Sequence, residues 1–379
     1  MPAHLNNILE MLKERFQNYP AFIEIALITI ILSVILLLLT NALLSLERLK
    51  DAYRKKRIKR ARALVMVELT SDVMMEDEVV EKDFNSLVHQ LNTLAVKDKI
   101  FNQVVIDEII YYHRNFTDST QRLLGKLFSK LNLLENSLNK IKNGTWELKA
   151  KGLREIQEMP ASEEVHALVN PLLNSKNHDL RIEAQAAYIR LNKDKPFGFL
   201  EHATEELLEW HQIILYELVS NTPELVVLDL KRLLLSKNTS VVSFSIKLIE
   251  YYQQLTAIPG LIRLMDHDDI QIREDAVSAL GKLDAEEGES KMIEKFPKEN
   301  LKVQLRILKS VGEIGSGRHL DFLKNQFLKS EEFPIIKTAG CALATYPEFD
   351  KESMLSGAHE VSPVRKTIIN HCTNVLIRN

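Results

Sequence analysis

The run DDIQIREDAVSALGKL, residues 268–283, decides the expected fold. Asp269 is a residue type that caps helices by accepting a backbone N–H, and apolar residues follow it at helical spacing. These apolar residues are Ile272, Ala276, Ala279, Leu280 and Leu283. The run therefore predicts a turn followed by one helix, with the pattern Asp-x-x-aliphatic-Arg-x-x-Ala, in which Arg273 supplies the arginine.

Versions of this pattern recur about every thirty residues from Thr145 onward. Each has a turn residue, an aliphatic residue three positions later and a small or apolar residue seven positions later. The sets are Thr145, Leu148 and Gly152; Asp179, Ile182 and Ala186; Thr239, Val242 and Ile246; Asp269, Ile272 and Ala276; Asn300, Val303 and Ile307; Glu332, Ile335 and Ala339; and Val361, Val364 and Ile368. One interval, from Asp179 to Thr239, is 60 residues long and predicts a degenerate unit near Glu209.

A second apolar segment precedes each of these anchors, for example residues 258–265, 320–328 and Pro223–Leu235. Each unit is therefore expected to be a helical hairpin. Because neither helix can bury its apolar face alone, hairpins at a fixed period stack into an α-solenoid. Sparse glycine (12) and proline (11) and an aromatic content of 7% also favour an all-α fold over a β-sandwich.

The unit AIPGLIRLM (257–265), DHDD (266–269) and IREDA (272–276) resembles HEAT repeats, most closely the HEAT-like type. The whole chain is similar to membrane-anchored HEAT repeat domain-containing proteins of Bacteroidetes-type bacteria, on the segments Leu123–Leu134 and Trp146–Leu153. The resemblance implies a bacterial solenoid that binds a protein partner. Members of that group often accompany a membrane glycosyltransferase, which the resemblance makes one expected partner.

An uncharged apolar run, IALITIILSVILLLLTNALLSL, occupies residues 25–46. As a helix its 22 residues would be roughly 33 Å long, enough to cross the hydrocarbon core of a bilayer. We expect a retained transmembrane helix over residues 21–46, after an amphipathic leader outside the cytoplasm over residues 1–20. A cleaved signal peptide is the alternative, but it would have a cationic start and a shorter apolar core.

A basic segment, residues 47–62, follows the apolar run. Its cations are Arg48, Lys50, Arg54, Lys55, Lys56, Arg57, Lys59, Arg60 and Arg62. With Glu47 and Asp51 the segment has a net charge of +7, which leaves −10 for the rest of a chain whose formal charge is −3. The positive-inside rule then predicts a single-pass protein of the bacterial inner membrane with its N-terminus outside and its solenoid in the cytoplasm.

The same cations are expected to gather anionic lipid headgroups. A nucleic-acid partner is disfavoured, because the cations lie beside a membrane and the remaining chain is acidic. A C-terminus outside the cell is the other topology, and it would need to override the charge rule.

The remaining chain is expected to form a helical cap region over residues 63–142 and a HEAT-like repeat solenoid over residues 143–379. Cys341 and Cys372 are in no metal-ligand spacing. In a reducing cytoplasm they are expected to be free, packed thiols.

Possible catalytic or ligand sites were sought along the whole chain. Asp266–Asp269 has ligand residue types but reads as a capped turn, and Gly315–Gly317 lacks the strand that precedes a dinucleotide loop. The single pair His359-Glu360 falls short of the several His-Glu pairs of HEAT-like di-iron hydroxylases. His202, Trp210 and His211 either line a pocket or pack. We expect no catalytic residue, no cofactor and no metal.

The sequence therefore predicts a membrane-tethered scaffold or adaptor, and not an enzyme. Its cytoplasmic solenoid would bind a protein partner through many small contacts along one row of helices. The alternative is a HEAT-like enzyme, or an enzyme accessory, that acts on a membrane-associated small molecule. An enclosed pocket with converging polar groups would favour that alternative.

Overall fold

The computed structural model describes residues 20–69, 81–116, 118–157, 163–222, 225–226, 229–347 and 362–373. All regular elements in these ranges are helices, so the chain is all-α as predicted. Contacts divide the chain into two units, Met1–Leu133 and Leu134–Asn379. The second unit thus begins before residue 143, where the solenoid was expected to start. The leader over residues 1–19 lies outside the described residues.

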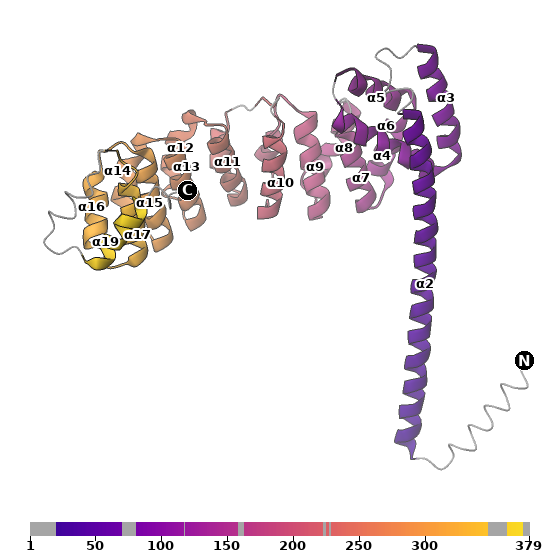
Figure 1. The fold of residues 1–379 in the computed structure, drawn as a ribbon, viewed down its shortest axis with the longest axis horizontal. Coiled ribbons are helices and arrows are strands. Elements are labelled where there is room, and N and C mark those ends of the chain that lie inside the picture. Colours follow the sequence, from indigo (N-terminus) through magenta and orange to yellow (C-terminus); the bar gives the residue numbers. More distant parts are fainter. Residues whose placement is uncertain are drawn as a thin grey trace, which may run out of the picture. The chain divides into compact units, whose positions relative to one another are not determined.

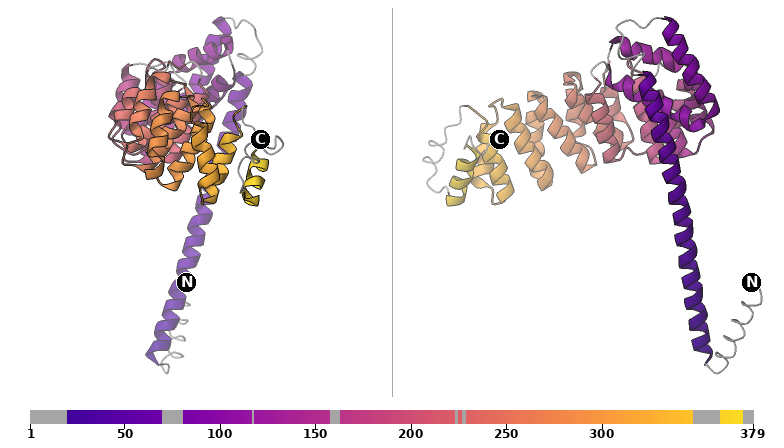
Figure 2. Two further views of the ribbon diagram at one scale, coloured as in Figure 1. Left: turned by 90° about the vertical axis from the view of Figure 1, so that its left-hand side faces the viewer. Right: turned by 45° about the vertical axis from the view of Figure 1, so that its right-hand side comes forward.

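The first unit contains α2 (Ala21–Leu69), one unbroken helix of 49 residues. Its length is roughly 73 Å at about 1.5 Å per residue. Figures 1 and 2 show it in indigo. Within it, Ile25–Val67 holds the one described segment long and apolar enough to cross a membrane, and none of that window is buried. Its last turns differ, because Ala61, Val65 and Leu69 are buried at a spacing of four.

These last turns of α2 pack against α4 (Lys99–Asn115), which also contacts α3 (Glu81–Lys97) and α5 (Asp118–Lys130). Helix α4 begins at the cap Asp98, whose carboxylate accepts a hydrogen bond of 2.8 Å from the Ile100 N–H. The basic segment of α2 therefore leads without a break into a packed helical unit.

The second unit is a succession of short helices. Its first half contains α6 (Leu133–Asn143), α7 (Trp146–Ile156), α8 (Glu163–Val169), η2 (Asn170–Leu172), α9 (His178–Leu191), η3 (Gly198–His202), α10 (Glu209–Ser220), η4 (Lys231–Leu235) and α11 (Thr239–Tyr251). Its second half contains η5 (Leu255–Ala257), α12 (Ile258–Leu264), α13 (Ile270–Lys282), α14 (Glu286–Lys295), η6 (Phe296–Lys298), α15 (Leu301–Ile314), α16 (Leu320–Lys329), α17 (Phe333–Leu343) and α19 (Pro363–Cys372).

The second helix of each hairpin belongs to a regular row, which we call the second row. Its members are α7, α9, α10, α11, α13, α15, α17 and α19. Figure 1 shows these helices side by side in chain order. Their N-caps are Thr145, Asn177, Leu208, Asn238, Asp269, Asn300, Glu332 and Ser362. Successive caps are 30 to 32 residues apart, and α10 is the degenerate unit that the sequence predicted near Glu209.

The cap positions refine two of the repeat anchors. In α9 the Asn177 side chain accepts a hydrogen bond of 2.9 Å from the Leu180 N–H, so the cap precedes the expected anchor, Asp179, by two residues. In α11 the cap is Asn238, not Thr239. Asparagine and aspartate are equally good caps, so residue type alone could not choose between Asn177 and Asp179.

The aliphatic and small positions of the repeat lie in the core in α11, α13, α15 and α17, but Leu148 of α7 and Val364 of α19 are 46% and 53% exposed, so the expectation is wrong for these two. Asp269 caps α13 and its carboxylate accepts from the Gln271 N–H at 2.7 Å. Buried residues at the expected repeat positions are Ile182, Ile272, Ala276, Val303, Ile307, Ile335 and Ala339. Ala186 is only partly buried, because the residue seven positions after the true cap of α9 is Ala184. The anchor Val361 lies outside the described residues.

Arg273, four residues after the N-cap Asp269, forms hydrogen bonds that connect the helix to the preceding turn. Its Nη1 donates to the carbonyl oxygens of His267 at 2.8 Å and Asp268 at 3.0 Å. Its Nη2 also pairs with the Glu299 carboxylate at 3.0 Å. Arg181, four residues after Asn177, makes the equivalent bond to a turn carbonyl. The arginine of the repeat pattern is thus structural.

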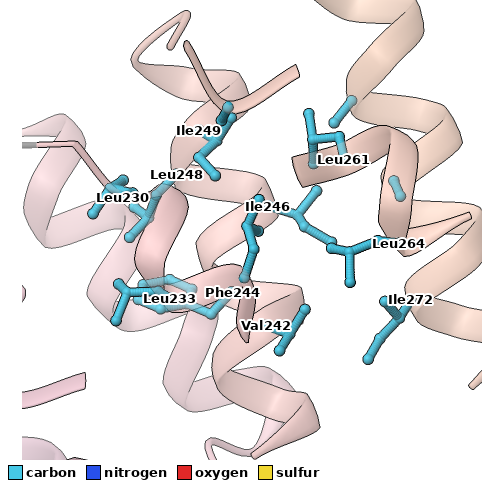
Figure 3. Packing of buried hydrophobic residues seen from close by; sticks show 14 of the residues in the cluster. Leu230, Leu233, Val242, Phe244, Ile246, Leu248, Ile249, Leu261, Leu264 and Ile272 are labelled. Carbon is cyan, nitrogen blue, oxygen red and sulfur yellow. The ribbon is translucent and has the colours of Figure 1, made fainter. Parts of the chain in front are cut away.

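The core is one continuous cluster of apolar side chains running from Leu138 to Cys372. Figure 3 shows Ile246 of α11 pointing toward Leu261 and Leu264 of α12. On the other side of α11, Phe244 lies beside Leu233 of η4. Each second-row helix is therefore buried between the first segments of two hairpins, as expected for a solenoid.

Two repeats depart from the predicted hairpin. Before α10 and α11 the first segments are the five-residue 3₁₀ helices η3 and η4, not full α-helices. The helix expected over Pro223–Leu235 is therefore wrong, since the described helix covers only Lys231–Leu235. Pro196, just before η3, and Gly198, its first residue, disfavour a longer helix.

Glycines let successive second-row helices touch. Gly281 and Gly312 both lie twelve residues after their caps, Asp269 and Asn300. A Cβ at Gly312 would lie 2.7 Å from the Ala342 Cβ, and one at Gly281 would lie 2.7 Å from the Ser310 Oγ. Both distances are shorter than van der Waals contact, so only glycine fits where α13, α15 and α17 meet.

The two cysteines differ from the expectation of free thiols. Cys341 of α17 and Cys372 of α19 form a disulfide, with Cα atoms 4.8 Å apart. They are 31 residues apart, one repeat, so they face each other on adjacent helices of the second row. Compartment and metal-ligand spacing do not reveal this contact, which follows from the repeat register.

We predict that Gly312→Ala destabilises the second unit. The added methyl group would overlap Ala342, and overpacking a close helix contact costs about 1–3 kcal/mol. This exceeds the gain of about 1 kcal/mol that alanine brings to a helix interior. Thermal unfolding followed by circular dichroism should show a lower melting temperature for the second unit.

Gly125→Ala in α5 is the matched control, because a Cβ at Gly125 meets no atom within 4 Å. It should leave stability unchanged or raise it. The double variant Gly312→Ala/Ala342→Gly should recover part of the lost stability. If Gly312→Ala and Gly125→Ala behave alike, the close contact does not limit the packing of α15 on α17.

Candidate binding groove

A groove of about 390 Å³ lies on the second row, across helices α7, α9 and α10. Its lining residues are Trp146, Glu147, Ala150, Arg154, Asp179, Ile182, Glu183, Ala186, Trp210 and Ile214. All ten belong to three consecutive helices of the second row, so the groove is built by the repeat itself.

The groove follows from the register of the N-caps. Positions two residues after a cap bring Glu147, Asp179 and Trp210 to corresponding places on neighbouring helices. The side chains five and nine residues after the Thr145 cap are Ala150 and Arg154, on the same helical face. Because α7 packs on α9 and α9 on α10, these positions line up as one surface.

Both tryptophans of the chain line this groove. Trp146 is 44% exposed and Trp210 is 42% exposed, although large aromatic side chains normally bury most of their surface. Ile213, the neighbour of Ile214 on α10, is 65% exposed. Exposed tryptophans beside aliphatic residues are typical of surfaces that bury themselves against a partner.

The groove also carries unbalanced negative charge. The Arg154 guanidinium pairs with the Glu183 carboxylate at 3.4 Å. No described residue forms an ion pair with Glu147 or Asp179. A hydrogen bond from the Thr145 side chain holds the pKa of the Glu147 carboxyl below its usual value, so this carboxylate is ionised at neutral pH. The groove therefore has a net charge of about −2 at neutral pH.

The same face continues over α10, α11 and α13, where a shallower groove of about 330 Å³ contains Ile213 and Tyr216. Here the charges balance, with Lys247 and Lys282 against Glu250 and Asp275. Lys282 forms an ion pair with Glu250, and the Lys247 Nζ donates to the Gln212 Oε1 at 2.9 Å. The net negative charge is thus a feature of the first groove, not of this second one.

His211 lies directly beneath the groove. It is fully buried, and its ring centre is 3.9 Å from that of Trp210. Neither ring nitrogen has a hydrogen-bond partner among the described residues. Burial, followed by the nearby charges of Arg181 and His178, lowers the pKa of His211 from its ordinary value of 6.5 to about 4. The ring is therefore neutral at physiological pH and acts as packing beneath Trp210.

His202, Trp210 and His211, which the sequence left as either pocket-lining or packed residues, have three different environments in the structure. Trp210 lines the groove, His211 is in the core, and His202 is exposed in η3. Trp146, Glu147 and Arg154 were not predicted from the sequence as site residues. The signal would have been the position two residues after the cap, which Glu147 shares with Asp179 and Trp210, but it depends on the correct cap of α9.

The four acidic and histidine residues before α13 form a turn. Asp266 pairs with Lys291 and Lys295, whose hydrogen bonds lower the pKa of its carboxyl to about 2. Asp269 caps the helix, and its N–H donates to the His267 Nδ1 at 3.0 Å. No group of three or more histidine, cysteine or acidic residues in the described ranges could hold a metal ion.

Gly315 and Gly317, in the other possible site, adopt positive φ angles of 65° and 77°. Gly315 is the left-handed C-cap of α15, so this segment ends a helix instead of opening a nucleotide-binding loop. The pair His359-Glu360 lies outside the described residues.

The nine cations of the basic segment all lie on α2 and are exposed. Two of them stabilise the first unit. The Arg57 guanidinium pairs with the Asp98 carboxylate at 2.7 Å, and Arg62 pairs with Glu108, whose side chain is 8% exposed. These two cations therefore hold α2 against α4.

No protein-family model and no curated protein matches this chain. Among solved structures, two engineered proteins from the Northeast Structural Genomics Consortium are each 14% identical to it. One covers 59% of this chain and 97% of its own length with a TM-score of 0.30. The other covers 83% and 87% with a TM-score of 0.33.

A microtubule polymerase with an array of TOG domains is 11% identical, covers 86% of this chain and 92% of its own length, and has a TM-score of 0.26. With TM-scores this low, the assignment of a helical solenoid rests on the repeat geometry of the chain itself.

We predict that the second unit loses stability in acid because of His211. The unfolded chain binds a proton at the ordinary pKa of 6.5, whereas the folded chain binds it only near 4. Stability is therefore complete above about pH 6.5 and falls, by about 3 kcal/mol at most, as the pH drops to about 4.

His211→Leu should remove this part of the pH dependence and keep full stability at pH 7, because it also removes an unsatisfied polar group. His202→Leu, at an exposed site, is the control and should unfold like the unaltered chain at every pH. Melting temperatures at pH 7 and pH 4.5 measure the difference. Parallel pH profiles for His211→Leu and the unaltered chain would contradict the assignment.

Proposed function

We propose that this chain is a membrane-tethered scaffold whose helical repeats bind a protein partner on the second row. The observation that carries the proposal is the groove of α7, α9 and α10, in which both tryptophans of the chain are more than two-fifths exposed. Aromatic residues are enriched among the residues that contribute most to protein–protein binding. A helical repeat array presents such a surface over several helices at once.

The tether is the apolar part of α2. Between Leu46 and Ala61, where packing begins, α2 has about 15 residues of exposed helix, roughly 22 Å. Tyr53 is 67% exposed on this stretch, and tyrosine is favoured at membrane–water interfaces. The uninterrupted helix supports a short, stiff link between a bilayer and the first unit. Restriction to a membrane would raise the effective concentration near membrane-bound partners.

The orientation that we propose has the N-terminus outside and the repeats in the cytoplasm of a bacterial cell, from the charge of the basic segment. Arg57 and Arg62 are engaged within the first unit. The other seven cations remain exposed on α2 and are the ones that we propose to attract anionic lipid headgroups. Similarity to bacterial proteins that accompany a membrane glycosyltransferase makes such an enzyme one partner to test.

The cysteine pair gives an independent report on this orientation. A reducing cytoplasm would convert the Cys341–Cys372 disulfide to two close thiols, whereas an oxidising compartment would keep the disulfide. The chain has only these two cysteines. Cells denatured in an alkylating reagent should therefore yield two labelled thiols without reductant. Labelling that appears only after reduction would place the repeats on the other side of the membrane.

A pull-down from mild detergent tests the proposed function. The full chain should retain a specific protein, and a shortened chain beginning at Arg54 should retain the same protein, because it keeps the packed end of α2 and all repeats. Trp146→Ala/Trp210→Ala should weaken retention at least tenfold, since each buried aromatic contact contributes about 1 kcal/mol or more.

Leu235→Ala is the matched control, because Leu235 is 75% exposed but belongs to η4 on the first segments of the hairpins. It should retain the partner normally. Retention that survives loss of both tryptophans, or that is lost in the chain beginning at Arg54, would contradict a binding surface on the second row.

A further inference from the structure

The groove of α7, α9 and α10 combines exposed aromatic faces with unpaired carboxylates. Glu147 is the next residue after Trp146 on α7, and Asp179 lies on α9, between the helices that carry the two tryptophans. A lysine or arginine side chain placed here could contact a tryptophan face and a carboxylate at the same time. Tryptophan is the best cation–π partner among the aromatic residues.

Other classes of ligand fit this charge poorly. An acidic peptide, a nucleic acid or an anionic lipid surface would be repelled by the net negative charge of the groove. A wholly apolar segment would bury Glu147 and Asp179 without a counter-charge, and burying an unpaired carboxylate is strongly unfavourable. Charge complementarity therefore selects a cationic occupant.

The spacing of the helices that form the groove determines the spacing expected between the cations of a bound segment. Neighbouring helices pack about 8–10 Å apart, and an extended chain of polyproline II type advances about 3.1 Å per residue and turns every third side chain to the same side. A segment running across α7, α9 and α10 thus passes one helix about every three residues. The small or aliphatic lining residues Ala150, Ile182 and Ala186 leave room for aliphatic side chains between the cations.

We propose that the groove binds an extended basic segment of the partner protein, with lysine or arginine at about every third position and aliphatic residues between them. The inference rests on the proposed function and names the chemistry of the partner. The cations of the bound segment lie against Trp146 and Trp210 and pair with Glu147 and Asp179. The basic segment of this chain, residues 47–62, is held as a helix in α2 and does not offer the extended form required here, so we assign the bound segment to another protein.

The chain contains its own reporter for this binding. It has two tryptophans, and both line the groove, so tryptophan emission reports on this site alone. The full chain in an uncharged detergent is titrated with a peptide of about twelve residues that has lysine at every third position and valine or serine between. A matched peptide has glutamate in place of each lysine.

The lysine peptide should change the emission in a saturable manner, and higher salt should weaken its binding, because the attraction between exposed charges is screened. The glutamate peptide should cause no change. Glu147→Gln and Asp179→Asn should each weaken the lysine peptide about two- to fivefold. Asp321→Asn on α16 is the control, since the Asp321 side chain is 94% exposed and far along the sequence, and it should bind as the unaltered chain does.

Equal binding of the two peptides, no binding of the lysine peptide, or unchanged binding in both carboxylate variants would each overturn the inference. If the lysine peptide fails while the tryptophan-dependent pull-down retains a protein, the scaffold function stands and only the basic segment is wrong. If the retained protein is a second copy of this chain, the assignment of the segment to another protein is overturned.

Discussion

Helix α15 packs directly on α13 at Gly281 and on α17 at Gly312, with no room for a Cβ atom at either glycine. This close contact between consecutive second-row helices is the constraint on which the repeat unit depends. It fixes the register of α13, α15 and α17 against one another, and the caps at 30- to 32-residue intervals repeat that register along the chain. The first segments can then vary, as η3 and η4 show, while the row is preserved.

The binding groove follows from the same register. Because α7, α9 and α10 begin at equivalent caps, their outward positions are aligned, and the two tryptophans and two unpaired carboxylates meet on one face. The buried His211 supports Trp210 from below without competing for a hydrogen bond at the surface. Binding residues on rigid helices keep their geometry without a partner, which lowers the entropic cost of association.

The fold could be predicted from the sequence more completely than the binding groove. Ile272 and Ala276 could be placed in the core because their helical periodicity follows directly from the need to bury one face. The long apolar part of α2 was equally plain from its lack of charge. The N-cap of α9 was harder to predict from the sequence, since both Asn177 and Asp179 can accept a hydrogen bond from a backbone N–H. Only packing selects between them.

That two-residue ambiguity hid the groove, because Glu147, Asp179 and Trp210 align only when the correct caps are used. The disulfide was missed for a related reason. Cys341 and Cys372 are one repeat apart, and that spacing becomes a contact only through the packing of α17 against α19. Local periodicity therefore predicts the helices, whereas the surfaces between repeats depend on register.

Site-specific photo-crosslinking in intact membranes tests the central claim most directly. A photoreactive residue would replace Ile213, 65% exposed on α10 in the second row, or Leu235, 75% exposed on η4 among the first segments. A partner held on the second row should give a discrete crosslinked protein from position 213 and none from position 235. Crosslinks that form equally at both positions, or only at 235, would contradict a scaffold that binds through its second row.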